Sequence, residues 1–231
     1  MKAMVLAAGR GERMRPLTDR LPKSLLQAGG KPLIVRHVEK LAAAGFTHVV
    51  INHAHLGHLI EAELGDGGRF GITIDYSAEK QALETAGGVA LALPKLGTEP
   101  FAVINADVYS DYDYSRLREA GARPLSSGAL AYLVLVDNPE HHAQGDFALH
   151  EGRLSLDGAK LTFSGLGVYR CEFFAHLQRG EHAKLAPLLY ANISRIVGEH
   201  YVGRWCDVGT PSRLAQLNAE LAAGPARRER L

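Results

Sequence analysis

The chain opens on Met4-Val5-Leu6-Ala7-Ala8-Gly9-Arg10-Gly11-Glu12-Arg13-Met14-Arg15-Pro16-Leu17-Thr18, the stretch that decides the fold. The apolar residues before Gly9 predict a short buried strand of the kind found at the centre of a parallel sheet. The run rich in glycine, arginine and proline that follows extends to residue 30. Loops of this length in compact domains usually carry function. We therefore expect a central strand that leads into a functional loop.

Beyond this loop the apolar periodicity alternates between helical and strand-like segments. Helices are expected over residues 32–45, 56–64 and 85–93, the last ended by Pro94, and strands over 47–51, 72–76 and 101–105. This alternation predicts a parallel sheet with helices on both faces. The second half is less regular, with strands expected over 129–136, 166–169 and near 201, a hairpin over 146–154, and helices over 171–178, 184–195 and from 211.

Composition excludes several classes of function. The net charge of +1, from 26 basic and 25 acidic residues, leaves neither a nucleic-acid footprint nor a polybasic membrane patch. No apolar run is long enough to span a membrane. The two cysteines, Cys171 and Cys206, lie far apart, which argues against a disulfide framework or structural zinc site and suits a reducing compartment. We expect a cytoplasmic protein that acts on small molecules, with its oligomeric state left open.

The loop after the first strand combines glycine with positive charge. Glycine lets the backbone approach a phosphate chain and direct N–H groups at it, and Arg13, Arg15 and Lys23 add the charge that a triphosphate needs. Met14 stands where a dinucleotide fingerprint needs its third glycine, and no Gly-Lys-Ser/Thr follows, as a P-loop would require. A bare Gly-x-Gly would fit an ordinary solvated turn equally well.

A longer signature runs through this loop: Gly9-x-Gly11-x-Arg13, then Pro16-x-Thr18, then Pro22-Lys23. It resembles the signature of the sugar nucleotidyltransferase family, and the resemblance extends over nearly the whole chain. It implies that the triphosphate lies against four residues: Ala8, Gly9, Arg10 and Gly11. It also implies that Arg13 and Lys23 are catalytic cations that neutralise charge on the α-phosphate and the departing pyrophosphate. One departure is Ser24, which follows Lys23 where the family commonly has proline.

Two aspartates extend this resemblance. Asn105 and Asp107 close the strand at 101–105 and share one of its faces, and Asp207 precedes the last helix. Taken singly, each aspartate also fits a capping role. Hard carboxylate oxygens suit Mg²⁺ that is bound through one or two side chains plus phosphates. Together with the glycine-rich loop they resemble the family's two metal ligands, which implies that Asp107 and Asp207 hold Mg²⁺ and take part in catalysis.

The resemblance also places the base and the sugar. Residues 79–88 resemble the family's nucleobase loop, which implies that Glu79, the backbone of Leu83 and Gly88 meet the nucleotide; a helix-capping loop is the alternative. The candidates for the sugar 1-phosphate are Asn105, Gly145, Asp146, Ser164, Gly165, Lys184 and Trp205. A Glu-Lys-Pro stretch common among relatives is missing here, so Lys184 is the substitute candidate for the contact to the sugar phosphate.

The fold class that we predict is one Rossmann-like α/β domain with a central mixed, mostly parallel sheet flanked by helices. It covers residues 1–225, with a nucleotide-binding half over about 1–110, a sugar-binding half over about 111–225 and a frayed tail at 226–231.

The expected reaction is transfer of a nucleotidyl group from a nucleoside triphosphate, UTP in preference, to a sugar 1-phosphate. N-acetylmuramate 1-phosphate, a sugar of cell-wall recycling, is the favoured acceptor, on the resemblance of residues 138–147 and 184–189 to that branch of the family. Guanylyl transfer to mannose 1-phosphate and thymidylyl or uridylyl transfer to glucose 1-phosphate are the alternatives. A catalytically silent nucleotide-sugar sensor on the same fold is the alternative from another class.

Overall fold

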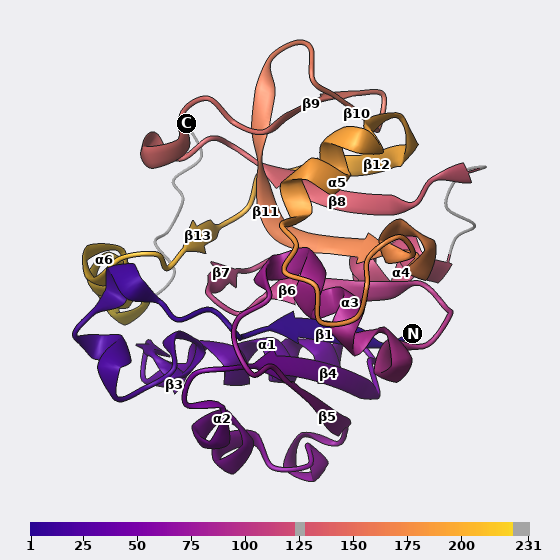
Figure 1. The fold of residues 1–231 in the computed structure, drawn as a ribbon. Helices are drawn as coiled ribbons and strands as arrows, with labels where there is room; N and C mark the ends of the chain where they lie inside the picture. The colour runs from indigo at the N-terminus through magenta and orange to yellow at the C-terminus, as the bar shows by residue number, and fades with distance from the viewer. Residues whose placement is uncertain (123–127, 224–231) are drawn as a thin grey trace.

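Nine strands form one sheet that runs through both halves of the chain, in the order β5-β4-β1-β6-β11-β8-β12-β10-β9 (Figure 1). The structure, a computed structural model, describes residues 1–122 and 128–223. The strands are β1 (Ala3–Leu6), β4 (His48–His53), β5 (Thr73–Ala78), β6 (Phe101–Asn105), β8 (Ala131–Val136), β9 (Phe147–His150), β10 (Arg153–Ser155), β11 (Lys160–Tyr169) and β12 (Ile196–Tyr201). Two small ribbons pair β2 (Gln27–Ala28) with β3 (Lys31–Pro32), and β7 (Val108–Ser110) with β13 (Trp205–Asp207).

The strand directions confirm a mixed sheet. β1 runs parallel to β4 and β6, and β4 runs parallel to β5. β11 then enters antiparallel to β6 and β8, and the parallel pairs lie mainly in the first half, with β12 and β8 as a further parallel pair in the second. The chain leaves β1 for β4 on one side and returns to β6 on the other. Open α/β sheets bind ligands beyond the carboxyl ends of their strands at such a reversal.

Helices cover both faces of the sheet, as the alternation predicts. On one face lie α1 (Leu33–Ala43), α2 (Gly57–Leu64) and α4 (Ser115–Ala122), and on the other lie α3 (Glu84–Leu96) and α5 (Leu185–Ala191). Successive side chains of a strand point to opposite faces. Accordingly Ala3 and Val5 are buried in the core beneath α1, while Met4 is buried in the core beneath α3.

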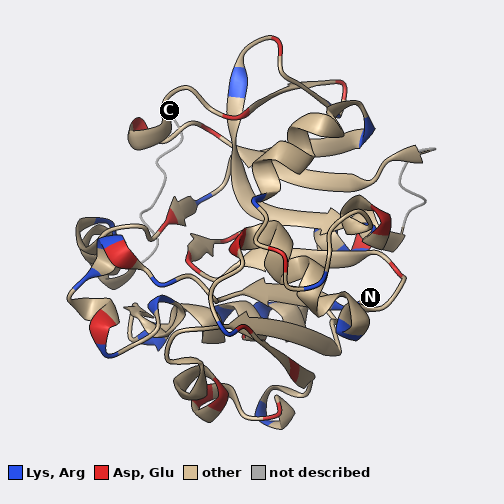
Figure 2. Cartoon of the chain, viewed as in Figure 1, with Lys and Arg blue, Asp and Glu red and all other residues tan. Residues whose placement is uncertain are grey.

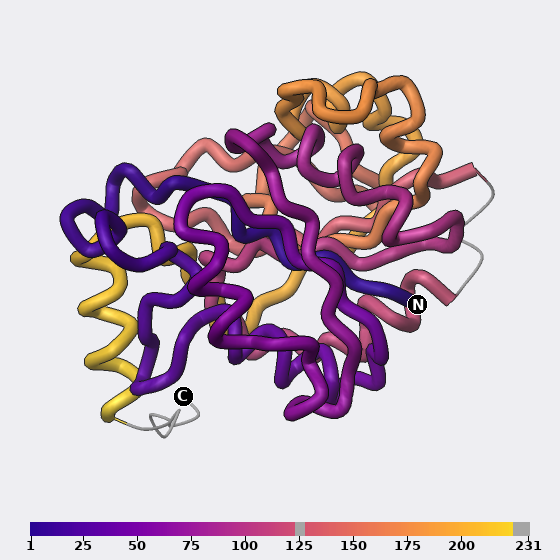
Figure 3. The backbone as a smooth tube through the Cα atoms, turned by 60° about the horizontal axis from the view of Figure 1, so that its bottom comes forward, coloured from indigo at the N-terminus to yellow at the C-terminus, as the bar shows by residue number. Residues whose placement is uncertain are grey.

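The last helix, α6 (Pro211–Ala222), packs against the glycine-rich loop rather than against the sheet. Both views of the backbone place it beside the first 30 residues (Figures 1 and 3). Leu214 and Leu217 of α6 share a buried cluster with Met14, Leu26 and Leu33. The loop itself is organised as three short 3-10 turns, at Glu12–Met14, Leu17–Asp19 and Lys23–Leu25. The two ends of the chain thereby build one corner of the molecule.

Several local predictions were wrong, and each error has a physical cause. Helix α3 continues past Pro94 to Leu96, because a proline in the last turn removes only one intrahelical bond. The helix expected over 171–178 is a short 3-10 turn, Cys171–Phe174, and the one expected over 184–195 ends at Ala191. Helix α4 and the ribbon β7–β13 were not anticipated. The expected tail at 226–231 lies outside the described residues.

Basic and acidic residues are nearly equal in number, and they are interspersed over the structure. Figure 2 shows Lys and Arg interspersed with Asp and Glu over the ribbon, in keeping with the net charge of +1. Within residues 1–122 and 128–223, no helix is both long and apolar enough to cross a membrane.

A strap from the second half ties down the start of α3. The backbone N–H of Ala183 donates to the carbonyl of Leu83 at 3.0 Å, and the N–H of Gly87 donates to the carbonyl of Ala183 at 3.0 Å. A Cβ atom on Gly87 would lie 2.2 Å from the carbonyl oxygen of Glu181. This position therefore has no room for a side chain.

We expect Gly87→Ala to destabilise the protein by about 1–3 kcal/mol, because the clash is with backbone that cannot rotate away. Chemical denaturation measures the loss. Gly68→Ala is the matched control, since the nearest atom to its added Cβ is the flexible Asp66 carboxylate at 3.1 Å. Equal unfolding midpoints for the two variants would contradict the strap's role.

Candidate active site

A cavity of about 390 Å³ opens at the carboxyl ends of β1, β4 and β6, where the strand order reverses. Its walls come from the glycine-rich loop, from the end of β6 and from the segment that enters α3. The lining residues are Leu6, Ala7, Ala8, Gly9, Arg10, Lys23, Ser24, Asn52, Ala82, Glu84, Thr85, Asn105, Ala106 and Asp107. Of the residues predicted from sequence, six meet here: Ala8, Gly9, Arg10, Lys23, Asn105 and Asp107. The volume falls within the usual range of small-molecule sites.

The glycine-rich loop is held in shape by its own polar groups. Gly11 adopts a left-handed φ of 69°, and a Cβ there would lie 3.0 Å from Thr18 and 3.1 Å from Lys23. The Thr18 hydroxyl donates to the Gly11 carbonyl at 2.8 Å, and Arg10 donates to the Thr18 carbonyl at 2.9 Å. Gly11 thus serves the close packing of the loop, and it does not line the cavity.

Lys23 and Asp107 form an ion pair across the cavity. The Lys23 side chain is 12% exposed and the Asp107 side chain is 38% exposed, so the Asp107 end of the pair is the more open to a ligand. Lys23 begins the third 3-10 turn, and Asp107 follows β6 directly. A cation and an acid therefore stand together at the edge of the sheet, where incoming phosphate would compete for the cation.

Asp207 is brought next to Asp107 by the ribbon β7–β13. In this ribbon Asp207 pairs with Val108, and the N–H of Val208 donates to the carbonyl of Asp107 at 2.7 Å. The two aspartates are 100 positions apart in the sequence and adjacent in the backbone. The ribbon therefore brings two acidic residues from distant parts of the sequence to one edge of the site.

The cation that accompanies Asp207 is Arg213, and His141 lies beside the pair. Arg213 Nη1 donates to both carboxylate oxygens of Asp207, at 2.5 and 2.6 Å. His141 Nε2 lies 2.6 Å from the same Nη1 and 3.0 Å from Asp207 Oδ1. The shorter contact fits an imidazole that accepts from the guanidinium. Each aspartate thus has its own counter-ion.

The segment expected to read the base is organised around a buried carboxylate. Glu79 accepts from the Asn52 amide at 2.7 Å and from the N–H of Leu83 at 2.9 Å. Burial raises the pKa of Glu79, against the lowering effect of these two hydrogen bonds. Asn52 in turn accepts from the N–H of Ala7 at 2.9 Å. This chain of bonds links the base loop to β4 and β1.

The match to known proteins fits this architecture. Residues 2–153, which contain the glycine-rich loop, the base loop and Asp107, match the family described as Nucleotidyl transferase.

The chain belongs to the nucleotidyl transferase family.

Relatives within this family differ in how much of their length the chain spans. It is 50% identical to the N-acetylmuramate alpha-1-phosphate uridylyltransferase of Neisseria meningitidis over 226 residues, 95% of this chain and 97% of that protein. It is 30% identical to the mannose-1-phosphate guanylyltransferase of Mycobacterium tuberculosis over 96% of this chain but 65% of that protein. A Bacillus anthracis structure assigned as a glucose-1-phosphate thymidylyltransferase superposes with a TM-score of 0.82, covering 95% of this chain and 94% of that one. At 22% identity it shows the shared fold alone.

In this nucleotidyl transferase the predicted base contacts lie behind the cavity. Glu79 is 6% exposed and Leu83 is also 6% exposed, and neither lines the cavity. A Cβ on Gly88 would lie 2.7 Å from both the Asn52 amide and the Glu79 carboxylate, so Gly88 permits this packing. Glu79 therefore supports the loop, and the walls that face a ligand are made by Ala82, Glu84 and Thr85.

The predicted sugar-side residues gather in two groups. Trp205 donates from its indole to the Ser164 carbonyl at 2.9 Å, and the left-handed Gly165 packs against the Asn105 side chain, so these four residues meet at the end of β6. Asp146 instead accepts from the N–H of Phe163 at 2.8 Å, within the second half of the chain.

Gly145, with φ 61°, leaves no room for a Cβ beside Asn138 and lets the loop at 138–146 fold tightly. This second group shapes a loop rather than lining the cavity.

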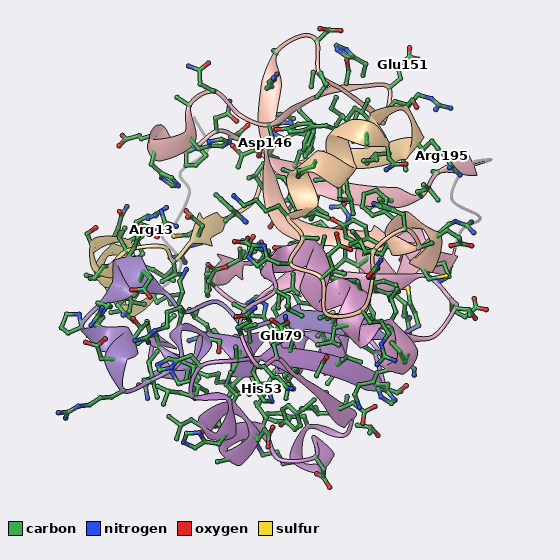
Figure 4. The ribbon with its side chains drawn as sticks, in the orientation of Figure 1. Arg13, His53, Glu79, Asp146, Glu151 and Arg195 are labelled. Atoms are coloured by element: carbon green, nitrogen blue, oxygen red, sulfur yellow. The ribbon has the colours of Figure 1, made fainter. Side chains whose placement is uncertain are left out.

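Two predicted cations stand apart from the cavity. Arg13 lies on the outer side of the glycine-rich loop, and Figure 4 shows it well separated from Glu79. Lys184 precedes α5 and is exposed. Within residues 1–122 and 128–223, neither side chain makes a hydrogen bond or ion pair, so their roles remain predictions.

Sequence reasoning missed Asn52 and Arg213, and it included Glu84 and His141 only as members of the segments 79–88 and 138–147, without giving them a role at the site. Glu84 lines the cavity in a left-handed conformation, with φ 63°, which is uncommon for a residue other than glycine. Asn52 was detectable as a polar residue at the carboxyl end of a buried strand. The contacts of His141 and Arg213 with each other and with Asp207 join segments that are distant in the sequence, so no local pattern predicts them.

Beneath the Asp107 loop lies a buried histidine. His37 of α1 bonds to the Tyr114 hydroxyl at 2.7 Å through Nδ1, while its Nε2 has no hydrogen-bond partner within the described chain. Burial, and secondarily the charge of Lys40, lowers the pKa of His37 from 6.5 to about 4. The folded protein thus resists protonating this side chain, which the unfolded chain accepts readily.

We therefore expect His37 to make the protein less stable in acid. The free energy of unfolding should fall by up to roughly 3 kcal/mol as the pH drops from about 6.5 to about 4, because only the unfolded state takes up the proton over that range. His37→Gln should remove this part of the dependence. Denaturant titrations of both proteins at several pH values measure it. A difference in stability between them that does not change with pH would refute the assignment.

Proposed function

We propose that the enzyme transfers the UMP group of UTP to N-acetylmuramate 1-phosphate, with release of pyrophosphate and with Mg²⁺ as its metal. The observation that carries this proposal is the 50% identity to the N-acetylmuramate alpha-1-phosphate uridylyltransferase, over nearly the full length of both chains. The mannose-1-phosphate guanylyltransferase is less similar and is covered over only 65% of its length.

In the proposed reaction an oxygen of the sugar phosphate bonds to the α-phosphorus of UTP. The bond from that phosphorus to the oxygen bridging to the β-phosphate breaks, and pyrophosphate leaves with the electron pair. A phosphate monoester is already an anionic nucleophile, so the protein's task is to position two anions and offset their repulsion. Lys23, which lines the cavity, supplies positive charge where the triphosphate would lie.

Two carboxylates, Asp107 and Asp207, fit a Mg²⁺ ion whose other ligands are phosphates and water. Within residues 1–122 and 128–223, no three His, Cys, Asp or Glu side chains gather as a self-sufficient metal site. Mg²⁺ needs none, since it commonly binds through one or two carboxylates plus substrate phosphates and water. Asp107 and Asp207 would hold it, and it would draw charge from the phosphates as a Lewis acid.

The nucleobase would lie against Ala82, Glu84 and Thr85 at the entrance to α3. The network through Glu79 and Asn52 fixes that segment to β1 and β4. The preference for UTP rests on the similar relative, and this wall is where selectivity among bases would arise.

The setting that we propose is the cytoplasm, where nucleoside triphosphates are made and where both cysteines, which are free in the structure, stay reduced. The product nucleotide-sugar would serve the recycling of cell-wall sugars.

A substrate matrix tests the proposal directly. UTP, GTP, dTTP and ATP are each combined with the 1-phosphates of N-acetylmuramic acid, N-acetylglucosamine, glucose and mannose, and pyrophosphate release is recorded. We expect UTP with N-acetylmuramate 1-phosphate to give the highest kcat/KM. Sugars without the lactyl group should react more slowly, because polar groups built for it would be left unpaired. A preference for GTP with mannose 1-phosphate would overturn the substrate assignment and leave the family intact.

Activity should also require both aspartates and a divalent ion. We expect Asp107→Asn and Asp207→Asn each to lower turnover by about 100-fold or more, since metal-mediated charge stabilisation contributes several kcal/mol. Asp137→Asn is the control, at an exposed aspartate that follows β8 and pairs with His200. Unfolding temperatures in chelator show whether the variants remain folded. Near-normal turnover of either variant, or of the unaltered enzyme in chelator, would disprove the metal assignment.

A further inference from the structure

We propose that Arg213 is the residue that binds the phosphate of the sugar 1-phosphate, an inference that rests on the proposed function. In this structure its guanidinium serves as the counter-ion of Asp207, and its Nη2 makes no hydrogen bond to the described residues. The contacts of Arg213, the rigidity of its surroundings and the charge balance of the site carry the argument.

Arg213 is held in place but is not saturated. Its Nε donates to the Thr210 hydroxyl at 3.4 Å, and its Nη1 contacts Asp207 and His141. An arginine has five N–H donors. Nη2 makes no hydrogen bond within residues 1–122 and 128–223, although the side chain is only 17% exposed. Two donors of a confined guanidinium are thus available to a ligand.

The backbone around Arg213 is shaped to this side chain. A Cβ on Gly209 would lie 2.3 Å from Nη2, so glycine at this position leaves space for the guanidinium where it lies. Arg213 stands in the first turn of α6, whose start is capped by the Thr210 hydroxyl. Packing of α6 on the glycine-rich loop fixes the position of this turn.

His141 closes the site from the opposite side. It belongs to a tight loop in which the Asn138 amide donates to the carbonyls of Lys160, at 2.9 Å, and Ala143, at 3.2 Å. The Thr162 hydroxyl donates to the Asn138 carbonyl oxygen at 2.8 Å. This rigid loop reaches α6 through the contact between His141 and Arg213, so the guanidinium lies between two fixed segments.

Charge balance then assigns the ligand. Beside Arg10 and Glu84 of the cavity wall, the site holds two carboxylate–cation pairs, Lys23–Asp107 and Arg213–Asp207. Once the two paired carboxylates serve a divalent ion, their cations are free to bind new anions. The reaction brings a triphosphate and a sugar phosphate. Lys23 lines the cavity assigned to the triphosphate, whereas Arg213 stands on the Asp207 side, beyond the lining residues. The anion left for Arg213 is the phosphate of the sugar.

Three variants test this assignment by kinetics. Arg213→Gln removes the charge. Arg213→Lys keeps the charge but lacks the planar guanidinium that can donate two parallel hydrogen bonds, and Arg204→Gln is the control. Arg204 lies just before β13 and pairs with Glu220 of α6 at 2.8 Å, so its loss removes one charge nearby. We expect Arg213→Gln to raise KM for the sugar 1-phosphate by about tenfold or more and to leave KM for UTP within about twofold. Arg213→Lys should restore part of the loss. A rise confined to KM for UTP would overturn the assignment.

Metal binding provides a readout that does not depend on turnover. Mn²⁺ titrations followed by electron paramagnetic resonance, without UTP, measure how far the sugar 1-phosphate tightens metal binding. When the sugar phosphate binds, Arg213 would leave Asp207 and so free this carboxylate for the metal. Mn²⁺ and the sugar 1-phosphate should therefore strengthen each other's binding. We expect Arg213→Gln to lower this coupling by about fivefold or more and Arg204→Gln to preserve it. Equal coupling in the unaltered enzyme, in Arg213→Gln and in Arg204→Gln would mean that Arg213 is only a structural counter-ion, and it would refute the proposal.

The choice of sugar separates the phosphate from other anions. N-acetylmuramate 1-phosphate carries a lactyl carboxylate, and N-acetylglucosamine 1-phosphate does not. A phosphate contact predicts similar losses for both sugars in Arg213→Gln. A loss confined to the muramate would mean that Arg213 binds the carboxylate, and the phosphate assignment would be wrong. If the unaltered enzyme prefers another sugar 1-phosphate, the same tests apply to that sugar, so failure of the substrate assignment is distinct from failure of this one.

Discussion

The pairing of Asp107 and Asp207 with one cation each is the interaction around which this site is arranged. The ribbon β7–β13 brings the backbone at Asp207 beside that at Asp107 through the bond from Val208 to Asp107. Lys23 of the glycine-rich loop pairs with Asp107, and Arg213 of α6 pairs with Asp207. The cations therefore stand beside the carboxylates, where phosphates would also meet the metal.

The fold supports this pairing by joining the two ends of the chain. The first 30 residues and α6 share a buried cluster that includes Met14, Leu33 and Leu217, which keeps the loop that carries Lys23 close to the helix that carries Arg213. The parallel strands β1, β4 and β6 provide the cavity floor, and the bonds through Asn52 and Glu79 lock the base loop onto that floor. The glycine-rich loop and α6 are thus joined by apolar packing, and the same two elements carry the cations that pair with Asp107 and Asp207.

Local features of the site were readable from sequence, and contacts between distant segments were not. The glycine-rich loop, the strand before Asp107 and the helical alternation follow from short-range patterns, and the structure places them as expected. The burial of Glu79 could not be predicted, because it depends on Asn52 in another strand. Likewise β7 and β13 are three residues each, too short to show periodicity, and they form only by pairing with each other. Arg213 becomes informative only once that pairing places Asp207 beside Asp107.

The separation of the two cations has a consequence for specificity. Lys23 belongs to a loop after β1 and faces the cavity with the base wall, while Arg213 belongs to α6 and faces the loop that carries His141. Substitutions around α6 and residues 138–146 can therefore change the fit of the sugar without moving the nucleotide wall. Because distant sites usually contribute additively, one scaffold can combine different bases with different sugars. Asp107 and Asp207, the carboxylates proposed to hold the metal, are the part that such variation has to leave unchanged.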